Sequence, residues 1–424
     1  MMVRVRIAPS PTGFAHVGTA YTALFNYAFA RHNGGTFIVR VEDTDVKRNV
    51  KGAEEAIFEG LKWLGIDWDE GGEKGGKFGP YRQSEKLEKY QKIAKDLVAK
   101  GMAYKEEGAI RFKNPGKDVS WEDLVHGKIT FPGGEITDFV ILKSDGYPTY
   151  NFGVVIDDLD MKISHVIRGE EHISNTPRQL ALYDALDEKP PFFAHHVTLR
   201  NAERKKLSKR RDPVDLRIYK EQGYLPEALV NFLCNMGFSH PEGNEIYPLA
   251  EYVKLFDLKR VRKAGPVFDL TKLDWINGEY IRRVGLDELS SRFKVQSAKF
   301  TKLDKEKQIA ITKLVQDRIK KLSEFDELAG FFFEERIPDK KLFGKNYKEH
   351  LKVATEALTG IKSWEKEKVD EVLMAAVKEN NFKTGDFFMD LRIAICGSKF
   401  TPPINDSIVI LGRKETLERL GKIK

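Results

Sequence analysis

Residues 3–19 read VRVRIAPSPTGFAHVGT and combine a strand, a loop and the start of a helix. Val3, Val5 and Ile7 alternate with two arginines, and this period of two is typical of a β-strand. Two prolines and a glycine then force an irregular loop, and apolar residues at helical spacing predict a helix from about residue 18 to residue 33.

A second strand is predicted at residues 36–41, which are mostly apolar and end in the acidic run 42–45. Strand, helix and strand in this order predict a βαβ unit with a right-handed crossover. Ligands of such units gather at the carboxyl ends of the strands. Arg6, Ser10, His16 and Glu42 all lie at that end, which makes it the first candidate site.

The pattern changes twice further along the chain. Helices are predicted at 53–64 and 90–100, and residues 104–143 then form short β-like runs separated by turns, as in a small unit inserted into the first domain. The α/β pattern resumes at residue 147 with a strand at 164–168. After about residue 212 the chain is dominantly helical, with a helix at 226–237. Another apolar helical stripe is predicted from Ile311, Val315, Ile319 and Leu322, surrounded by the basic residues of 313–321.

Composition indicates a globular chain of several domains. The 424 residues are 41% hydrophobic and 32% charged, and 71 Lys+Arg against 64 Asp+Glu give a net charge of +7, which is compatible with a polyanionic partner. Two cysteines exclude a disulfide framework and a cysteine-rich zinc site, and they fit a reducing compartment. Because we find neither a signal-peptide core nor an apolar stretch of membrane-spanning length, we expect a cytoplasmic protein that does not bind membranes.

Two short stretches carry residues suited to phosphate chemistry. His16-Val17-Gly18-Thr19 opens the first helix, where backbone N–H groups and the helix dipole favour an anion. Gly18 leaves room for a base or ribose to approach the backbone. In the basic loop around Lys206-Leu207-Ser208-Lys209-Arg210, Lys209 can act as a mobile cation that neutralises a leaving pyrophosphate. Taken singly, each stretch is also compatible with a purely structural helix start or a solvated basic loop.

Taken together, residues 8–19 and 206–210 resemble the two signatures of class I aminoacyl-tRNA synthetases. Further blocks resemble bacterial glutamyl-tRNA synthetases, and they lie at residues 6–13, 40–45, 79–85, 147–152, 166–172, 225–229 and 265–269. The resemblance implies an α/β fold: a Rossmann-like class I synthetase catalytic domain with a small α+β insertion, followed by all-α C-terminal domains. It divides the chain into a catalytic domain (1–81 and 148–212), an inserted acceptor-end-binding domain (82–147), a stem-contact helical domain (213–300) and a helical anticodon-binding domain (301–424).

The resemblance also assigns roles to individual residues. Arg6 and Tyr150 face the side-chain carboxylate of glutamate, Glu42 takes its ammonium group, and Arg168 and Ser10 hold the α-carboxylate, with Ala8 completing the glutamate site. The planar fork of arginine suits a carboxylate and disfavours glutamine, whose amide presents donors. The implied ATP-binding residues are Thr12, His16, Gly18, Glu171 and Lys209, and the implied catalytic residues are His16, Gly18, Lys206, Ser208 and Lys209. Arg4, by contrast, we interpret as a surface residue.

The implied activity is that of a glutamate–tRNA ligase that uses ATP with Mg²⁺. The partners are L-glutamate, ATP and tRNA(Glu), the enzyme is expected to be a monomer, and charging of tRNA(Gln) stays open. The insertion is short and lacks cysteine, so we expect neither zinc nor another protein-held metal. We weighed a queuosine-modifying glutamyltransferase, whose relatives end soon after the catalytic domain, and an inactive paralogue, which would be expected to have lost His16, Glu42, Arg168 or Lys209.

Three other signals are interpreted structurally. His195 and His196 are adjacent on a predicted strand, so they point to opposite faces and make a poor metal site. The run Phe331-Phe332-Phe333 is predicted to be helical-domain core and not a base-stacking platform. The stretch 71–79, rich in glycine and lysine, is predicted to be a solvated connector because no strand leads into it.

Overall fold

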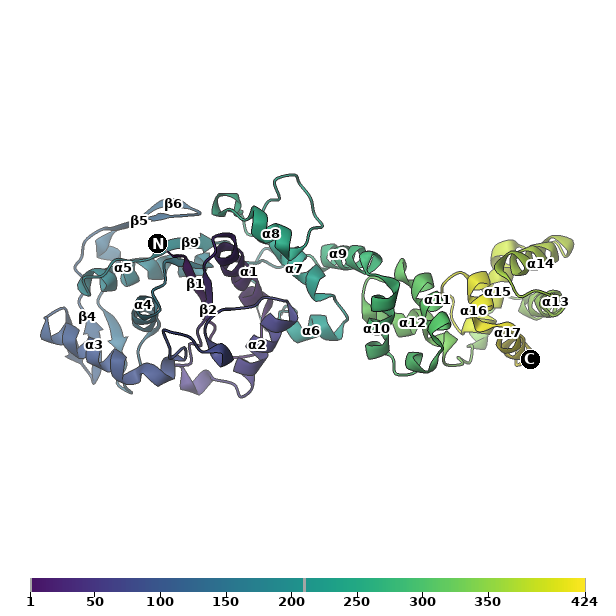
Figure 1. The fold of residues 1–424 in the computed structure, drawn as a ribbon, viewed down its shortest axis with the longest axis horizontal. Coiled ribbons are helices and arrows are strands. Elements are labelled where there is room, and N and C mark those ends of the chain that lie inside the picture. The colour runs from purple at the N-terminus through teal and green to yellow at the C-terminus, as the bar shows by residue number, and fades with distance from the viewer. Residues whose placement is uncertain (1, 209–210, 424) are drawn as a thin grey trace. The chain divides into compact units, whose positions relative to one another are not determined.

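The computed structural model describes residues 2–208 and 211–423, which divide into two compact units. The first unit comprises residues 1–220 and 226–276, and the second comprises residues 221–225 and 277–424. Figure 1 shows the elements of both units along the chain. Each unit is described by itself below.

The first unit is built on parallel strands with helices on both faces. β1 (Arg4–Ile7) pairs in parallel with β2 (Thr36–Val39) through the crossover helix α1 (Val17–His32). β8 (His165–Gly169) lies on the other side of β1, where the Ser164 N–H donates to the Arg4 carbonyl at 2.9 Å, and it pairs in parallel with β9 (Phe192–His196). The predicted βαβ unit is therefore confirmed (Figure 1).

The segment predicted as an insertion forms one small sheet and one hairpin. β3 (Ala103–Glu106), β4 (Ala109–Phe112) and β7 (Phe139–Leu142) are antiparallel. β5 (Val119–Asp123) and β6 (Gly127–Phe131) form a hairpin, which joins the main sheet where Asp123 pairs in parallel with Phe193 of β9. One edge of the segment is thus continuous with the strands that carry the candidate site.

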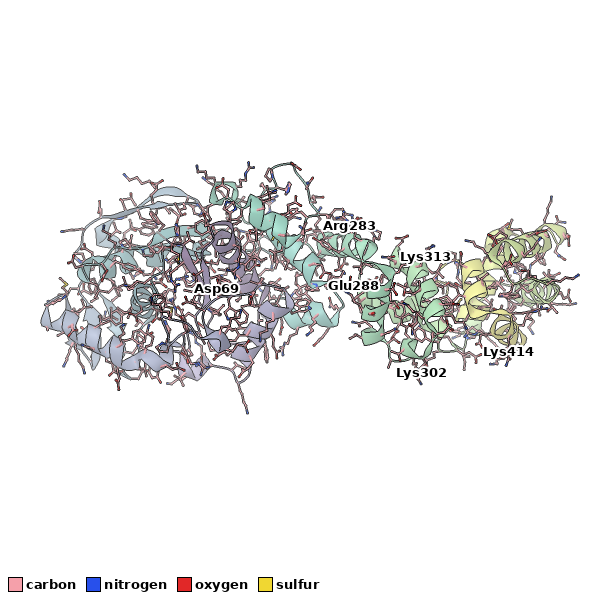
Figure 2. The ribbon with its side chains drawn as sticks, viewed as in Figure 1. Asp69, Arg283, Glu288, Lys302, Lys313 and Lys414 are labelled. Atoms are coloured by element: carbon pink, nitrogen blue, oxygen red, sulfur yellow. The ribbon has the colours of Figure 1, made fainter. Side chains whose placement is uncertain are left out.

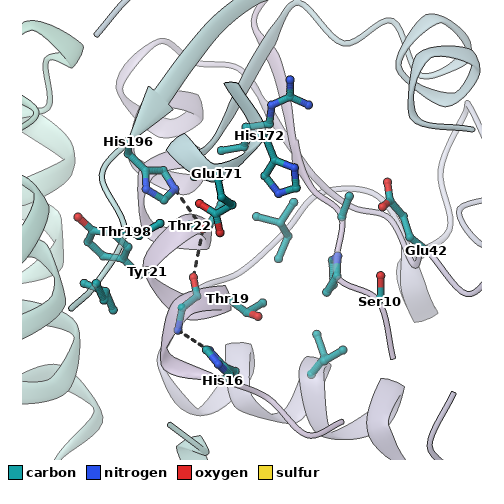
Figure 3. Close-up of a pocket in the computed structure, with 18 of the residues that line it drawn as sticks. Ser10, His16, Thr19, Tyr21, Thr22, Glu42, Glu171, His172, His196 and Thr198 are labelled. Atoms are coloured by element: carbon teal, nitrogen blue, oxygen red, sulfur yellow. Dashed lines mark hydrogen bonds between the residues drawn. The ribbon is translucent and has the colours of Figure 1, made fainter. Parts of the chain in front are cut away.

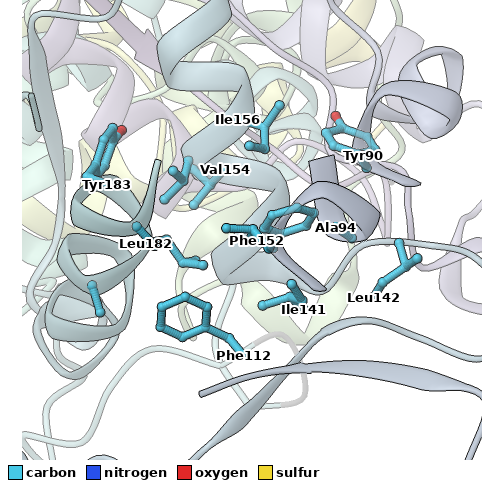
Figure 4. Packing of buried hydrophobic residues seen from close by; sticks show 14 of the residues in the cluster. Tyr90, Ala94, Phe112, Ile141, Leu142, Phe152, Val154, Ile156, Leu182 and Tyr183 are labelled. Carbon is cyan, nitrogen blue, oxygen red and sulfur yellow. The ribbon is translucent and has the colours of Figure 1, made fainter. Parts of the chain in front are cut away.

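One hydrophobic cluster connects this segment with the α/β core. Its helices are α3 (Leu87–Ala99), α4 (Tyr150–Asp160) and α5 (Thr176–Ala185). Figure 4 shows Tyr90 and Phe112 from the segment together with Phe152 and Leu182 from the later helices, and all four are buried. This packing holds α4 in place through the buried residues of its first turns.

Five further helices belong wholly or partly to the first unit: α2 (Ala53–Trp63), α6 (Leu216–Glu221), α7 (Pro226–Gly237), α8 (Leu249–Leu255) and α9 (Leu270–Arg283), the last containing the boundary between the units. The helices predicted at 53–64 and 226–237 are confirmed to within one residue. Pro226 occupies the first position of α7, where its missing N–H has no consequence.

The second unit is entirely helical in its described residues. Its helices are α10 (Leu286–Gln296), α11 (Lys305–Gln316), α12 (Phe325–Ala329), α13 (Tyr347–Thr359), α14 (Lys366–Glu379), α15 (Thr384–Cys396), α16 (Ile404–Leu411) and α17 (Arg413–Gly421). Phe331 is fully buried and Phe332 is 8% exposed, so the prediction that this aromatic run is core is confirmed. Lys302, Lys313 and Lys414 are exposed on this unit (Figure 2). The predicted α/β fold with an all-α C-terminal part is confirmed.

Two predictions about local structure are wrong. α11 ends at Gln316, so residues 313–321 do not form one helix; Ile319 and Leu322 are buried from the following turns instead. Arg4 is not a surface residue: it is 8% exposed and donates to both carboxylate oxygens of Glu70 at 2.8 and 2.9 Å. β1 lies between β2 and β8 and is covered on both faces, so the arginines that alternate with its apolar residues are buried as well.

None of the described helices has the length and apolar character needed to cross a membrane.

Candidate active site

A cavity of about 530 Å³ opens at the carboxyl ends of β1 and β8, beside the start of α1. Figure 3 shows Ser10 and Glu42 on one side of it and His16, Glu171 and Thr198 on the other. Most residues predicted for the site line this cavity, and these are Arg6, Ala8, Ser10, Thr12, His16, Gly18, Glu42, Tyr150, Arg168, Glu171 and Lys206. Ser208 does not line it, and Lys209 lies outside the described residues.

Arg168, in β8, is a buried cation held only by neutral groups. Its Nε donates to His195 Nε2 at 3.1 Å, its Nη1 to the Tyr150 hydroxyl at 3.4 Å and its Nη2 to Thr176 Oγ1 at 2.8 Å. The residue is 4% exposed, and burial lowers the pKa of its guanidinium. Within residues 2–208 and 211–423 no carboxylate pairs with it. A buried charge without a partner is costly, so the site is prepared for an anion that enters the cavity.

Arg6, in β1, already has a carboxylate. Its Nε and Nη2 donate to the two carboxylate oxygens of Asp158 in α4, at 3.0 and 3.1 Å, whereas its Nη1 has no partner in the described part of the chain. Asp158 also accepts from Arg40 Nη1 at 2.7 Å. Burial raises the pKa of Asp158, but Arg6 and Arg40 together hold it below its ordinary value. Arg6 is therefore fixed side-on, with its Nη1 left for a ligand.

Glu42 supplies the buried anion of the cavity. It lies three residues after the end of β2, is 7% exposed, and its Oε1 accepts from Arg40 Nη2 at 3.1 Å. Burial raises the pKa of Glu42, against the opposing effect of Arg40 and Arg6. Arg40 is fully buried and links Asp158 to Glu42, so one buried network positions both the cation of Arg6 and the anion of Glu42. The cavity thus presents a negative group close to two positive ones.

The start of α1 forms another wall of the cavity. His16 is the N-cap, and its Nδ1 accepts from the Gly18 N–H at 2.9 Å, while the Val17 N–H donates to the Val214 carbonyl at 2.8 Å. Two of the first N–H groups are therefore already used, and that of Thr19 has no partner among the residues described here. A Cβ on Gly18 would lie 2.9 Å from His16 Nδ1, so a larger residue here would displace the capping side chain of His16, which Figure 3 labels.

The basic loop reaches the cavity through Lys206. Its Nζ donates to Glu171 Oε1 at 2.8 Å; burial raises the pKa of Glu171, but this contact with Lys206 lowers it below its usual range. A Cβ on Gly169 would lie 2.0 Å from Glu171 Oε2, so a larger residue there would move this carboxylate from its present position. The Ser208 N–H donates to Asp212 Oδ2 at 2.8 Å and so fixes the loop near its tip. Glu171 therefore helps to hold Lys206 at the cavity.

Comparison with known proteins agrees with this geometry. The family model for the catalytic domain of class I tRNA synthetases (E and Q) matches residues 2–109 and 105–275, and a model for an anticodon binding domain matches residues 271–424. The chain belongs to the class I tRNA synthetases of the E and Q type. The resemblance found in the sequence is thereby confirmed.

Relatives of this synthetase family match over the whole length. The glutamate–tRNA ligase of Acidothermus cellulolyticus is 42% identical and covers 100% of this chain and 95% of its own. That of Bacillus mycoides is 39% identical, covering 99% of each. The crystal structure of a glutamate tRNA ligase from Elizabethkingia meningosepticum in complex with its amino acid is 32% identical, with a TM-score of 0.86, and covers 100% of this chain and 99% of that one.

Several residues of this synthetase site escaped the sequence analysis. His172 lines the cavity with its Nδ1 3.1 Å from the Tyr150 hydroxyl, and burial together with the charge of Arg168 lowers its pKa to about 4, so it is neutral at pH 7. It lies in a block that carried the resemblance, which was the available signal. Asp158 and Arg40 had no such signal, because nothing in a sequence shows which charges will share one buried network.

The two adjacent histidines face opposite sides of β9, as predicted. His196 stacks on Phe25 of α1 with ring centroids 4.6 Å apart, and its Nε2 lies 3.1 Å from Thr22 Oγ1. His195 instead faces Arg168 and Thr176. Across residues 2–208 and 211–423, no three His, Cys, Asp or Glu side chains come together in a group that could hold a metal ion.

Proposed function

We propose that the protein is a glutamate–tRNA ligase, which activates L-glutamate with ATP and transfers it to the terminal adenosine of tRNA(Glu). The observation that carries the proposal is Arg168: it is buried at the cavity, and its described partners are all neutral. A carboxylate of an amino-acid substrate would supply the missing negative charge, and buried Glu42 would receive the ammonium group. The whole-length matches to glutamate–tRNA ligases support the same substrate.

In the bound complex we assign the side-chain carboxylate to Arg6 and Tyr150. The α-carboxylate lies at Arg168 and Ser10, and Ala8 lines the same part of the cavity. The free Nη1 of Arg6 supports its role, because either oxygen of a carboxylate can accept from it, whereas in the amide of glutamine only the oxygen can.

ATP is proposed to lie at the α1 side of the cavity, against Thr12, His16, Gly18 and Glu171, with the phosphates toward the Thr19 N–H and the 206–209 loop. The α-carboxylate of glutamate attacks the α-phosphate, a new C–O–P bond forms, and pyrophosphate leaves. Lys209 and Lys206 neutralise the charge that develops on the leaving group, and Ser208 shapes the loop. Positioning and charge stabilisation suffice, so no enzyme nucleophile takes part.

Magnesium enters with ATP in this proposal. Of the described residues that line the cavity, only Glu42 and Glu171 carry carboxylates, and Glu171 is already paired with Lys206. This supports a Mg²⁺ ion held by phosphates and water and not by a protein cage. We propose no zinc site.

The second step transfers the glutamyl group from the adenylate to a ribose hydroxyl of the tRNA. We propose that residues 1–81 and 148–212 form the catalytic domain and that residues 82–147 bind the acceptor end. Residues 213–300 would contact the stem and residues 301–424 the anticodon; the match to the anticodon-binding-domain model, at 271–424, contains the whole of the second segment and the end of the first. Basic side chains such as Lys302, Lys313 and Lys414 suit contacts with the phosphate backbone (Figure 2). We further propose a monomer in the cytoplasm, where the free thiols of Cys234 and Cys396 would persist.

The test is aminoacylation with purified tRNA(Glu) and tRNA(Gln), each offered glutamate and glutamine. We expect glutamyl-tRNA(Glu) and no glutaminyl-tRNA, and the tRNA(Gln) arm shows whether the enzyme charges that tRNA too. Absence of glutamyl-tRNA with every tRNA, under conditions in which the protein is folded, would refute the proposal.

A further inference from the structure

A chain of three buried side chains leads from the β5–β6 hairpin to the cavity. Asp123 Oδ2, at the end of β5, lies 2.6 Å from His195 Nδ1 in β9, and His195 Nε2 accepts from Arg168 Nε at 3.1 Å. Asp123 is 2% exposed, His195 is fully buried and Arg168 is 4% exposed. Only the last of the three lines the cavity.

The hydrogen bonds determine the state of His195. Arginine can only donate, so Nε2 must be the unprotonated nitrogen. The proton of a neutral imidazole is then on Nδ1, where it is donated to Asp123. Asp123 is itself fixed by the N–H groups of Val125 and His126, both at 3.0 Å from its Oδ1. Each group in the chain therefore orients the next.

The two arginines of the cavity differ in how they are held. Arg6 is fixed by the carboxylate of Asp158, which neutralises its charge. Arg168 is fixed by the neutral ring of His195, and the carboxylate of Asp123 lies on the other side of that ring. An anion can therefore gain the full attraction of Arg168 once it enters the low-dielectric cavity. A carboxylate at the position of His195 would have oriented Arg168 equally well but would have competed with the substrate.

We propose that His195, oriented by Asp123, is a positioning residue that aims Arg168 at a carboxylate of the amino-acid substrate without neutralising it. The inference rests on the proposed function, because it concerns how that substrate is bound. Sequence patterns gave no indication of it: Asp123 belongs to the segment that we assign to acceptor-end binding, and His195 had only a structural interpretation.

The experiment compares His195→Asn with His195→Gln in steady-state aminoacylation of tRNA(Glu). The asparagine amide can replace Nδ1 but does not reach Arg168, whereas the glutamine amide reaches the position of Nε2. For His195→Asn we expect KM for glutamate to rise roughly ten- to a hundredfold, with KM for ATP and kcat close to wild type. For His195→Gln we expect most of that loss to be recovered, which is a response that a purely structural role would not give.

A matched control exists in the second unit. His350 Nδ1 lies 2.7 Å from Asp390 Oδ2, and both residues are buried, so His350→Asn makes the same replacement in an equivalent buried pair that does not line the cavity. We expect it to lower the melting temperature while leaving KM for glutamate unchanged. Asp123→Asn should raise KM for glutamate by a smaller factor than His195→Asn, because the amide oxygen can still accept from Nδ1.

The outcomes separate the inference from the proposed function. A wild-type protein that forms no glutamyl-tRNA overturns both. An active wild type with KM for glutamate unchanged in folded His195→Asn, or with equal losses in the asparagine and glutamine variants, overturns only the positioning role. If His195→Asn does not fold, the Asp123→Asn and His195→Gln variants decide: wild-type values of KM in Asp123→Asn, or a rise in KM for ATP equal to that for glutamate, overturn the inference.

Discussion

Replacing Arg168 by lysine is the most direct test of the glutamate site. The change keeps the positive charge and removes the planar fork, which donates to His195, Tyr150 and Thr176 and would still have to meet a carboxylate. A hydrogen bond to a charged group contributes about 1.5–3 kcal/mol, and at least one of the bonds of a bidentate pair is lost. We therefore expect KM for glutamate to rise roughly 10- to 150-fold.

The assay is aminoacylation at varied glutamate with saturating ATP and tRNA(Glu). Arg4→Lys is the matched control, because Arg4 is also buried in the central sheet but is already paired with Glu70 and does not line the cavity. We expect it to cost stability, seen as a lower melting temperature, with KM for glutamate unchanged. A folded Arg168→Lys variant with wild-type KM for glutamate would show that this guanidinium does not contact the substrate.

Three further predictions follow from the same site. Lys209→Ala should lower adenylate formation on the order of 10²–10³-fold in pyrophosphate exchange, with glutamate binding little changed; full exchange activity would refute the assigned role. Asp158→Asn should raise KM for glutamate about tenfold by releasing Arg6, whereas Asp157→Asn, whose hydrogen-bond partners are Lys86, Gln83 and Tyr90 and which lies 3.7 Å from Arg40 Nε, should raise it by a smaller factor; equal effects would contradict this. Glu42 must be ionised to attract the ammonium group, and burial raises its pKa, so kcat/KM for glutamate should fall on acidification at a higher pH than an ordinary carboxylate would cause; an acid limb that persists in Glu42→Gln would exclude this cause.

The sequence pattern was sufficient to predict those segments in which one period, that of a strand or that of a helix, continues from end to end. The βαβ unit, α2 and α7 follow from spacing, caps and breakers within a few residues of one another. The same reasoning brought Arg6, Ser10, His16 and Glu42 to one end of the sheet, because parallel strands place their carboxyl ends together. The resemblance added Tyr150, Arg168, Glu171 and Lys206 to that end, and all of them line the cavity.

Sequence patterns gave wrong predictions where segments distant in the sequence determine whether a residue is buried. The alternation of β1 suggested that Arg4 faces solvent, but Glu70 comes from a loop 66 residues away and buries it. The stripe from Ile311 to Leu322 kept its helical spacing beyond the end of α11, because the turn that follows buries Ile319 and Leu322 against the same core. The spacing of apolar residues indicates which residues are buried. A residue can be buried without being part of the helix, so the spacing did not show where α11 ends.

The sequence by itself determined the order of the elements, the family and many of the side chains that meet at the cavity. Only the tertiary structure decided which of those charges are compensated. Arg6 meets Asp158 across 152 residues and is neutralised, whereas Arg168 meets His195, whose proton is held by Asp123, and keeps its charge for a ligand. The difference depends on which helix or hairpin packs over each strand end, and in a low-dielectric interior that packing sets both the pKa of a group and its affinity for an anion.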